Sequence, residues 1–529
     1  MPLLLTHLPF LLLLGFTAWR LLQTMLNHDV GYYLQMANAL HEGRLLYRTF
    51  PDFGLPSNAW LAQFSFELAH AAGLPLVPLH QLVLFGLVLG GLLLTHASLQ
   101  RLVPHDSLVH AAALPLLSVP FFLLANQSFG QREHLFIVLF APLALLVAGR
   151  HLGLRPPRAL SVLTALAGAL GCSMKPHLLL PLATLTVGDL CLHRFALRRL
   201  AVELWLTAAL LTVYFALVLL LYPTYFTRTL PDALVTYRTY GRPFQELLAG
   251  ALRPISLGFL AILALGTLIL RRRHLRLPLH LDLAGLWLGL GLSLVVLYFS
   301  QRQGFAYHHL PATMYFLASL LLFVTLLLDS FLPPLGQFAR VLTRVAAVGL
   351  FVLAALVQQR VAPVATRAQL LASPLFAVLH ALPPNTPIFS LQTGVPPIAP
   401  SLAYTDLRWT GAMGQLVELP AIVRERDEHR DPPPRLVAIE QDMRARVLLS
   451  LTDPQPDVVL VDVTVPLRWL ESYGKPFALV DFLQEDPAFT QQWRRYERVT
   501  TVQDPVFGLQ VEVYRRRDRP ELLANFPHR

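Results

Sequence analysis

Charge is scarce in this sequence: only 14% of its 529 residues are Asp, Glu, Lys or Arg. A soluble protein of this length could bury a large core, but its surface would still need many more charged residues. The apolar residues instead come in blocks of about twenty, each long enough to cross a hydrocarbon layer of roughly 30 Å as a helix. With 55% hydrophobic residues and a mean hydropathy of +0.53, the composition predicts a polytopic α-helical membrane protein.

Cysteine is rarer still, with two residues in the chain, and the sequence also lacks the features of a cleaved leader. Cys172 and Cys191 both lie beside or within apolar segments, so no disulfide framework is expected. The N-terminus has an apolar run without a basic region or a small-residue cleavage site, and we interpret it as an uncleaved first span.

The net charge of +10 does not indicate a nucleic acid partner, because the arginines cluster between apolar blocks, where a membrane topology needs them.

The apolar blocks predict about eleven spans. The first runs from about 3 to 22 and is followed by a long polar loop at 23–58. A half-apolar segment at 59–76 either lies at the interface or begins the next span. Clear candidates then follow at about 78–99, 107–125, 134–150, 159–173, 178–192, 200–222, 254–270, 282–300, 310–328 and 341–358. The two candidates around Met174 could be one broken helix, so the number of spans is approximate.

Arginine distribution predicts the orientation of these spans. Alternate loops carry arginines, and the positive-inside rule makes those loops cytoplasmic: Arg101; Arg150, Arg155 and Arg158; Arg194, Arg198 and Arg199; Arg271, Arg272, Arg273 and Arg276; Arg340 and Arg344. The opposite loops also carry some arginines, but the short loops obey the rule. The sequence therefore predicts a multi-span domain at 1–360, with 23–58 as its first outer loop, and an extracytoplasmic domain at 361–529.

The region after Arg360 is rich in proline, acids and glutamine and holds no further span. Strands are predicted at 387–391, 458–462 and 509–514, and helices near 366–382, 439–451 and 488–496. This pattern predicts an α/β soluble domain that covers a site or helps to select an acceptor. Tyr404, Asp406 and Trp409 form an aromatic, polar turn that could contact a sugar, although a plain surface loop is the preferred interpretation.

The predicted topology places five unusual polar clusters where spans meet the outer face. They are HD at 28–29, PD at 51–52, GQREH at 130–134, SMKPH at 173–177 and QRQGFAYHH at 301–309. Ionisable groups at membrane depth are costly and are usually paired or functional. Lys175 is the sharpest case, because the chain has only one other lysine, Lys475, and Lys175 interrupts an apolar stretch. The convergence of these clusters on one face predicts a site there.

Each of these residues also has a purely structural interpretation. Asp29 could cap a helix beginning near Gly31, and Lys175 could extend toward the lipid headgroups. Arg132 with Glu133 could form an interfacial ion pair, and His308 with His309 could be interfacial histidines. No His, Cys or Asp spacing is typical of a metal site, and there is no Gly-rich phosphate loop or nucleophile elbow. No metal or other cofactor is therefore expected.

The outer loop resembles a known family. NHDVGYYLQMA at 27–37, EGRLLY at 42–47 and PDFGLP at 51–56 are similar to the first outer loop of the GT-C glycosyltransferases. The resemblance is to the bacterial branch near the protein O-mannosyltransferases and the lipid A aminoarabinose transferases, in which QREH at 131–134 also has a counterpart. The motifs cover about a tenth of the chain, while the topology fits along its whole length. Many members have a second acid directly after the Asp; here Val30 follows Asp29, so a second carboxylate would come from Asp52 or Glu133.

The resemblance implies an inner-membrane enzyme of bacteria that transfers a hexosyl or pentosyl group. The donor would be a polyprenyl-phosphate sugar, and the acceptor a glycan, lipid or protein at the outer face. Asp29 would be the general base, with Asp52 as second choice, in a single inverting displacement. Lys175 and Arg132 would bind the lipid phosphate, and Tyr307 and His308 would donate neutral hydrogen bonds to it. The candidate substrate-binding residues are His28, Tyr32, Arg132, Glu133, His134, Lys175, His177, Gln303, Tyr307, His308 and His309.

Two other classes of protein share the hydrophobic pattern. A lipid or sugar transporter or flippase would also place charges at membrane depth, but inverted repeats and matching broken helices would be expected, and the sequence shows no convincing internal repeat. A non-catalytic scaffold would not need Asp29, Lys175 and the histidine cluster on one side of the membrane. The transferase interpretation requires Asp29 and Lys175 to face one outer cavity.

Overall fold

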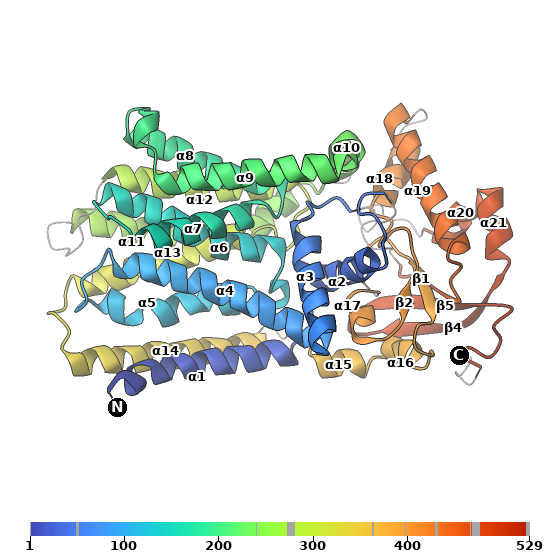
Figure 1. Cartoon of the computed structure of the whole chain (residues 1–529), viewed down its shortest axis with the longest axis horizontal. Helices are drawn as coiled ribbons and strands as arrows, with labels where there is room; N and C mark the ends of the chain where they lie inside the picture. Colours follow the sequence, from blue (N-terminus) through green and yellow to red (C-terminus); the bar gives the residue numbers. More distant parts are fainter. Residues whose placement is uncertain are drawn as a thin grey trace. The chain divides into compact units, whose positions relative to one another are not determined.

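The computed structural model describes residues 2–48, 52–239, 241–271, 281–361, 364–396, 398–428, 432–465, 467 and 477–524. Pro51, Lys475 and the arginines at 272, 273 and 276 lie outside the described residues. Contacts within the chain divide it into two compact units (Figure 1). The first consists of Met1–Leu22, Gln81–Leu217 and Arg242–Val364, and the second of Gln23–His80, Val218–Gly241 and Ala365–Arg529. The functional division predicted at residue 360 stays a prediction.

The first unit is a bundle of apolar helices. Seven described helices are long and apolar enough to cross a membrane: α4 (Leu76–Gln100), α6 (Arg132–His151), α9 (Val202–Leu221), α11 (Phe244–Leu270), α12 (Leu281–Gln301), α13 (Leu310–Asp329) and α14 (Gln337–Val361). Four further helical segments are also apolar: α1 (Pro2–Gln23), α5 (Leu108–Ser118) with η1 (Val119–Leu123), α7 (Arg158–Cys172), and η3 (Pro176–Leu178) with α8 (Leu179–Leu192). The predicted polytopic helical fold is confirmed, while the number of spans stays a prediction.

Close helix pairs hold this bundle together. α6 packs on α7, α11 on α13, α5 on α14 and α8 on α12. Small residues allow the close approach that packing between membrane helices requires. A Cβ at Gly171 of α7 would lie 3.1 Å from the carbonyl oxygen of Phe136 in α6. Large apolar side chains on the outward faces, such as Leu270, Phe338 and Leu350, are exposed, as expected for surfaces that contact lipid.

The second unit is built around a five-stranded sheet in the order β2-β1-β3-β5-β4. β1 (Pro387–Leu391) runs parallel to β2 (Arg408–Trp409) and β3 (Val458–Asp462), whereas β5 (Leu509–Arg516) is antiparallel to β3 and to β4 (Tyr496–Asp504). All five residues of β3 are buried, as expected for a central strand covered on both faces. β4 and β5 form a hairpin that turns through Gly508 at φ +65°.

The second unit also contains helices from each of the three chain segments that form it. From the sequence after 365 come α15 (Arg367–Leu371), α16 (Pro374–His380), α17 (Ile398–Ser401), α18 (Leu419–Glu428), α19 (Pro434–Thr452), α20 (Leu479–Gln484) and α21 (Pro487–Trp493). η5 (Tyr225–Thr229) and α10 (Leu230–Thr239) also belong here, and α10 packs on α18 and α19. α2 (His28–His41) and α3 (Ser57–Ala72) pack on each other, and α17 packs on α2.

The predicted α/β character of the C-terminal segment is confirmed, with corrections. β1 and β3 have the predicted bounds, and β5 begins at the predicted Leu509. The predicted helix at 488–496 is wrong at its end, because α21 stops at Trp493 and Tyr496 begins β4. The helix predicted near 366–382 is two helices, since Ser373 caps a new helix at Pro374. α3 ends at Gly73 in the left-handed region (φ +63°) and belongs to the second unit, so the segment at 59–76 does not begin the next span.

Candidate functional site

Three helix ends of the first unit meet at Glu133. This carboxylate lies in the first turn of α6, where the helix dipole favours a negative charge. Lys175 lies in the turn between α7 and η3, in the extended conformation that a following proline favours. Nζ of Lys175 is paired with Oε1 of Glu133. Nε2 of His308, in the segment between α12 and α13, lies 3.9 Å from the same oxygen.

These groups are buried: Glu133 is 1% exposed, His308 2% and Lys175 7%. Lys175 therefore does not extend toward headgroups, and its partner is the acid predicted to pair with Arg132. Breaking a buried pair by removing one partner leaves an uncompensated charge, so this pair fixes the relative positions of α6 and the α7–α8 turn. The Lys175 ammonium also lies 5.4 Å from the centre of the Tyr307 ring, a distance typical of a cation–π contact.

Several polar atoms of this cluster are buried without a hydrogen-bond partner among the described residues. They are Oε2 of Glu133, Nδ1 of His308 and Nε2 of His177. Buried polar atoms in folded proteins are nearly always hydrogen-bonded, so a group of such atoms beside a lysine is a place where a polar ligand can bind. Burial, and then the neighbouring Lys175, His177 and Arg132, lower the pKa of His308 well below its ordinary value. His308 is therefore neutral and can donate a hydrogen bond to an anion.

The other predicted residues of the first unit differ in their surroundings. His134 is fully buried, and both of its ring nitrogens are used: Nδ1 accepts from the backbone N–H of Gly130 at 3.0 Å, and Nε2 donates to the carbonyl of Phe121 at 2.7 Å. His134 thus has no ring nitrogen left for a ligand and instead fixes the turn before α6. Nδ1 of His309 lies 3.1 Å from the Thr313 hydroxyl. Gln303 is buried in the segment before α13, at 7% exposure.

In the second unit, the predicted base lies at the start of α2. The helix begins at His28, and the Asn27 side chain caps it by accepting from the backbone N–H of Asp29 at 2.9 Å. The alternative that Asp29 is itself the cap is therefore wrong. Asp29 lies in the first turn, its side chain is 14% exposed, and Oδ1 lies 3.5 Å from Nε2 of His28. A carboxylate held beside an imidazole and within reach of water is chemically suited to accept a proton.

Asp52 and Tyr32 lie near each other in the second unit, together with an acid that sequence patterns did not indicate. Burial, with the charge of Asp52 as the next cause, raises the pKa of the Tyr32 hydroxyl well above its ordinary value. Glu418, just before α18, also contributes to this shift. Glu418 is 3% exposed and accepts a 2.7 Å hydrogen bond from Nη2 of Arg446. Nothing local in the sequence singles it out, because its role depends on packing with a segment nearly 400 residues away.

Two glycines, one facing Tyr32 and one in α2, lie so close to neighbouring atoms that no side chain fits at either position. A Cβ on Gly414 would overlap the Tyr32 ring, and a Cβ on Gly31 would lie 2.8 Å from Cα of Pro400. Arg44 donates to the carbonyl oxygens of Gly411, Trp409 and Thr410 at 2.9 to 3.3 Å. The outer-loop motif residues thus anchor the segment 23–48 to the sheet of the second unit.

The predicted surface turn at 404–409 is also corrected. Trp409 lies in β2, is 3% exposed and packs on Phe389 at a ring-centre distance of 5.8 Å. The Tyr404 hydroxyl accepts from the backbone N–H of Leu26 at 2.9 Å. Trp409 is therefore part of the core of the second unit and cannot present its ring to a sugar.

Comparison with known proteins shows what fold this is. No family model matches the chain, and no curated protein matches it. Among solved structures, ArnT from Cupriavidus metallidurans bound to undecaprenyl phosphate is similar over 95% of this chain and 97% of that chain, with a TM-score of 0.54 and 14% identity. The apo state of the same ArnT gives a TM-score of 0.51 and 13% identity over the same shares. The chain therefore has the fold of these ArnT structures, and the predicted multi-span helical fold with a C-terminal α/β domain is confirmed.

Proposed function

We propose that this chain, which has the fold of ArnT, is an integral membrane glycosyltransferase of GT-C type. It transfers a sugar from a polyprenyl-phosphate carrier to an acceptor at the outer, periplasmic face of a bacterial inner membrane. The observation that carries the proposal is the buried group of Lys175, Glu133 and His308 at the ends of membrane helices. ArnT has been crystallised with undecaprenyl phosphate, which supports a carrier of the same chemical class here.

The lipid phosphate is proposed to bind at the first unit. Lys175 and Arg132 supply positive charge, while the neutral His308 and Tyr307 donate hydrogen bonds. These donors act most strongly where charge develops, on the phosphate oxygen that leaves the anomeric carbon. Glu133 holds Lys175 in place, so that the ammonium position is set before the donor binds. With two cations at the phosphate, the displacement needs no metal ion, and we propose none at this site.

The second unit is proposed to supply the base. The acceptor hydroxyl oxygen attacks the anomeric carbon, its proton passes to Asp29, and the bond from that carbon to the phosphate oxygen breaks. The products are the glycosylated acceptor and polyprenyl phosphate, and the configuration at the anomeric carbon is inverted. Asp52 beside Tyr32 is the second candidate for the base.

The test is a transfer assay with the purified chain in lipid and a panel of polyprenyl-phosphate hexoses and pentoses. We expect one member of the panel to be consumed with release of polyprenyl phosphate. Asp29→Asn should lower the rate at least 10³-fold, a loss on the order expected when a general base is removed, while undecaprenyl phosphate still binds. Asp52→Asn is the matched variant, and full activity of Asp29→Asn would transfer the role of base away from Asp29.

The same assay separates the transferase from a transporter or flippase. A transporter would move the donor across the bilayer of proteoliposomes without breaking the sugar–phosphate bond. Accumulation of intact donor on the opposite side, with no released polyprenyl phosphate for any member of the panel, would overturn the proposal.

A further inference from the structure

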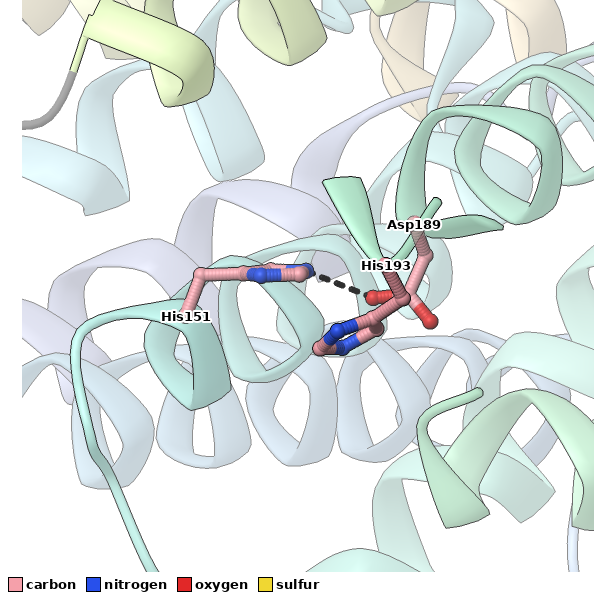
Figure 2. Close-up of side chains that lie close together, drawn as sticks. All are labelled: His151, Asp189 and His193. Atoms are coloured by element: carbon pink, nitrogen blue, oxygen red, sulfur yellow. Dashed lines mark hydrogen bonds and ion pairs between the residues drawn. The ribbon is translucent and has the colours of Figure 1, made fainter. Parts of the chain in front are cut away.

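A second cluster of functional side chains lies at the opposite ends of the helices in the first unit. His151 is the last residue of α6, Asp189 lies in the last turn of α8, and His193 is the residue that follows α8. One donor atom from each, two ring nitrogens and a carboxylate oxygen, lie within 4.8 Å of one another. Figure 2 shows the two imidazole rings and the carboxylate converging from α6 and α8. We propose that these three residues bind one divalent transition-metal ion, of which Zn²⁺ fits best.

The spacing along the chain explains why the three side chains meet. Asp189 and His193 are four residues apart, and this spacing places both on one face at the end of α8. His151 comes from α6, 38 residues before Asp189. The sequence alone therefore shows only an Asp-x-x-x-His pair, which is too common to indicate a metal site. The third ligand is added by the packing of the first unit.

The carboxylate is already oriented as a metal ligand would be. Oδ1 of Asp189 lies 2.6 Å from Nε2 of His151, while Oδ2 accepts from the backbone N–H of Ala201 at 3.0 Å. A hydrogen bond to the second oxygen is the outer-shell contact that fixes metal-binding carboxylates in proteins. Two ligands of one Zn²⁺ lie roughly 3 to 4 Å apart when each bond is about 2.0–2.2 Å. Small rotations of the two rings would therefore bring all three atoms onto one ion.

The three ligands are not all fully buried, so solvent can reach one side of the site and supply water ligands to the ion. Asp189 is 1% exposed, whereas the His151 side chain is 12% exposed. Arg150 and Arg194 directly adjoin ligands in the sequence, and the charge of Arg150 is offset by Glu203, which accepts two 2.7 Å hydrogen bonds from its guanidinium. Two imidazoles with one carboxylate favour zinc and its neighbours over Mg²⁺ or Ca²⁺, which prefer oxygen ligands.

The simpler alternative is a hydrogen bond between His151 and Asp189 with no metal. It accounts for two of the residues but not for His193, whose ring centre lies 4.7 Å from that of His151 at an angle of 31°. A bound ion would explain why a donor atom of a second imidazole lies within 4.8 Å of the atoms of this pair. It would tie α6 to α8 and, through Ala201, to the start of α9.

This site is distinct from the proposed transfer site. Lys175 precedes α8 and His193 follows it, and α8 with its 14 residues is about 21 Å long at about 1.5 Å per residue. The arginine-rich segments that flank His151 and His193 are predicted to be cytoplasmic. We therefore assign the ion a structural role at the cytoplasmic ends of the helices, where it does not take part in sugar transfer.

The test uses the full chain purified in detergent without a polyhistidine tag and stripped with a chelator. Titration with Zn²⁺ by calorimetry should give one equivalent, and Co²⁺ should give the visible absorption of a nitrogen- and oxygen-ligated ion. His193→Gln should weaken binding by at least the 10–100-fold typical for loss of a mere outer-shell partner. His380→Gln, an exposed histidine at the end of α16, is the matched control and should bind as the unchanged chain does.

A stability measurement separates a bound ion from a simple hydrogen bond between His151 and Asp189. If the ion binds the folded state, Zn²⁺ should raise the midpoint of thermal unfolding of the unchanged chain but not of His193→Gln. Size-exclusion chromatography of His193→Gln checks that the variant is folded. The proposal is overturned if the unchanged chain binds no Zn²⁺, or if His193→Gln and His380→Gln bind it equally. Neither result depends on whether the chain transfers sugars.

Discussion

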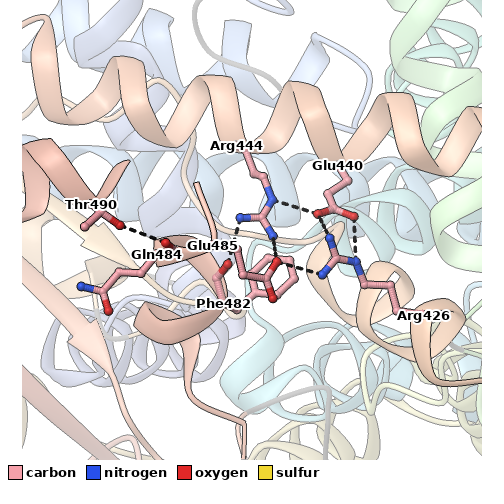
Figure 3. Close-up of polar contacts among 7 residues, drawn as sticks. All are labelled: Arg426, Glu440, Arg444, Phe482, Gln484, Glu485 and Thr490. Carbon is pink, nitrogen blue, oxygen red and sulfur yellow. Dashed lines mark hydrogen bonds and ion pairs between the residues drawn. The ribbon is translucent and has the colours of Figure 1, made fainter. Parts of the chain in front are cut away.

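Two ionic groups, one in each unit, hold their charges in different ways. In the first unit, Lys175 and Glu133 form a single buried pair at helix ends. In the second, Arg426, Glu440, Arg444 and Glu485 form a network between α18, α19 and α20 that surrounds Phe482 (Figure 3). Half of the Glu485 side chain is exposed, at 52%. Water can replace a lost partner at Arg426 and Glu485, the exposed members of the network, whereas nothing can replace one in the buried pair.

The comparison teaches which ionic group is expected to serve function. Exposed ion pairs contribute little to stability because water and salt screen them. A lone buried pair costs desolvation free energy and is poor evidence for stability. The Lys175–Glu133 pair is therefore better explained by the need to hold a cation at the membrane boundary, as the proposed phosphate site requires.

Removing one partner of the buried pair should have the largest effect. We expect Glu133→Gln to destabilise the chain by about 3–5 kcal/mol, because the Lys175 ammonium is left buried without its counter-ion. Lys175→Met should abolish binding of the carrier phosphate, measured by calorimetry with undecaprenyl phosphate, with Lys475→Met as the control at the only other lysine. Unchanged affinity in Lys175→Met would remove this lysine from the phosphate site.

Filling the space beneath Tyr32 should have the next largest effect and should act on the second unit. Gly414→Ala places a methyl group into the Tyr32 ring, and we expect a loss of about 1–3 kcal/mol, as is typical of overpacking. Gly349→Ala in α14 is the matched control, since its Cβ would meet nothing within 4 Å. Thermal unfolding of both variants measures the difference, and equal midpoints would contradict the close packing at Gly414.

Acidification should weaken the first unit through His308. Its pKa is lowered by burial in the folded chain, so the unfolded chain takes up a proton first as the pH falls. The stability that neutral His308 provides is complete above its ordinary pKa of 6.5 and declines below it, by up to about 1.4 kcal/mol per pH unit. His308→Asn should reduce the change of the thermal unfolding midpoint with pH between pH 7 and 5, roughly the range in which histidine titrates. If the midpoint of this variant changes with pH as that of the unchanged chain does, the result would argue against a buried neutral histidine.

Loss of one member of the exposed network should have the smallest effect. Arg426→Gln removes pairs with Glu440 and Glu485, but Arg444 still donates to both acids at 2.8 and 2.7 Å. We expect a change of less than about 1 kcal/mol in the free energy of unfolding. A loss as large as that of Glu133→Gln would show that exposure does not separate the two ionic groups.

Much of the fold could be predicted from the sequence because its signals are local. Apolar blocks became helices such as α4, α9 and α13 near the predicted positions, and buried β-branched runs became β1 and β3 with the predicted bounds. β4 was not predicted, because the helix-like pattern that ends at Trp493 lies directly before it and hides where the strand begins. Pairing with β5, rather than local propensity, makes Tyr496–Asp504 a strand.

The candidate site was only partly visible for a different reason. Lys175 stood out because lysine is so rare here, but the identity of its partner, Glu133 rather than the headgroups, depends on how α6 meets the α7–α8 turn. His134 matched a motif, yet its two backbone hydrogen bonds show that it fixes a turn. Glu418 carried no signal, because its neighbour Tyr32 lies in a remote part of the chain.

The sequence by itself determined that this chain is a polytopic helical membrane protein, roughly where most of its apolar helices lie, and which polar residues interrupt them. These features follow from hydrophobicity and local backbone preference, which act over about twenty residues. Only the tertiary structure decided that Lys175 pairs with Glu133, that the outer loop at 23–48 packs with the C-terminal sheet, and that His151, Asp189 and His193 converge. Those outcomes depend on the rotation and packing of whole helices, which no local pattern specifies.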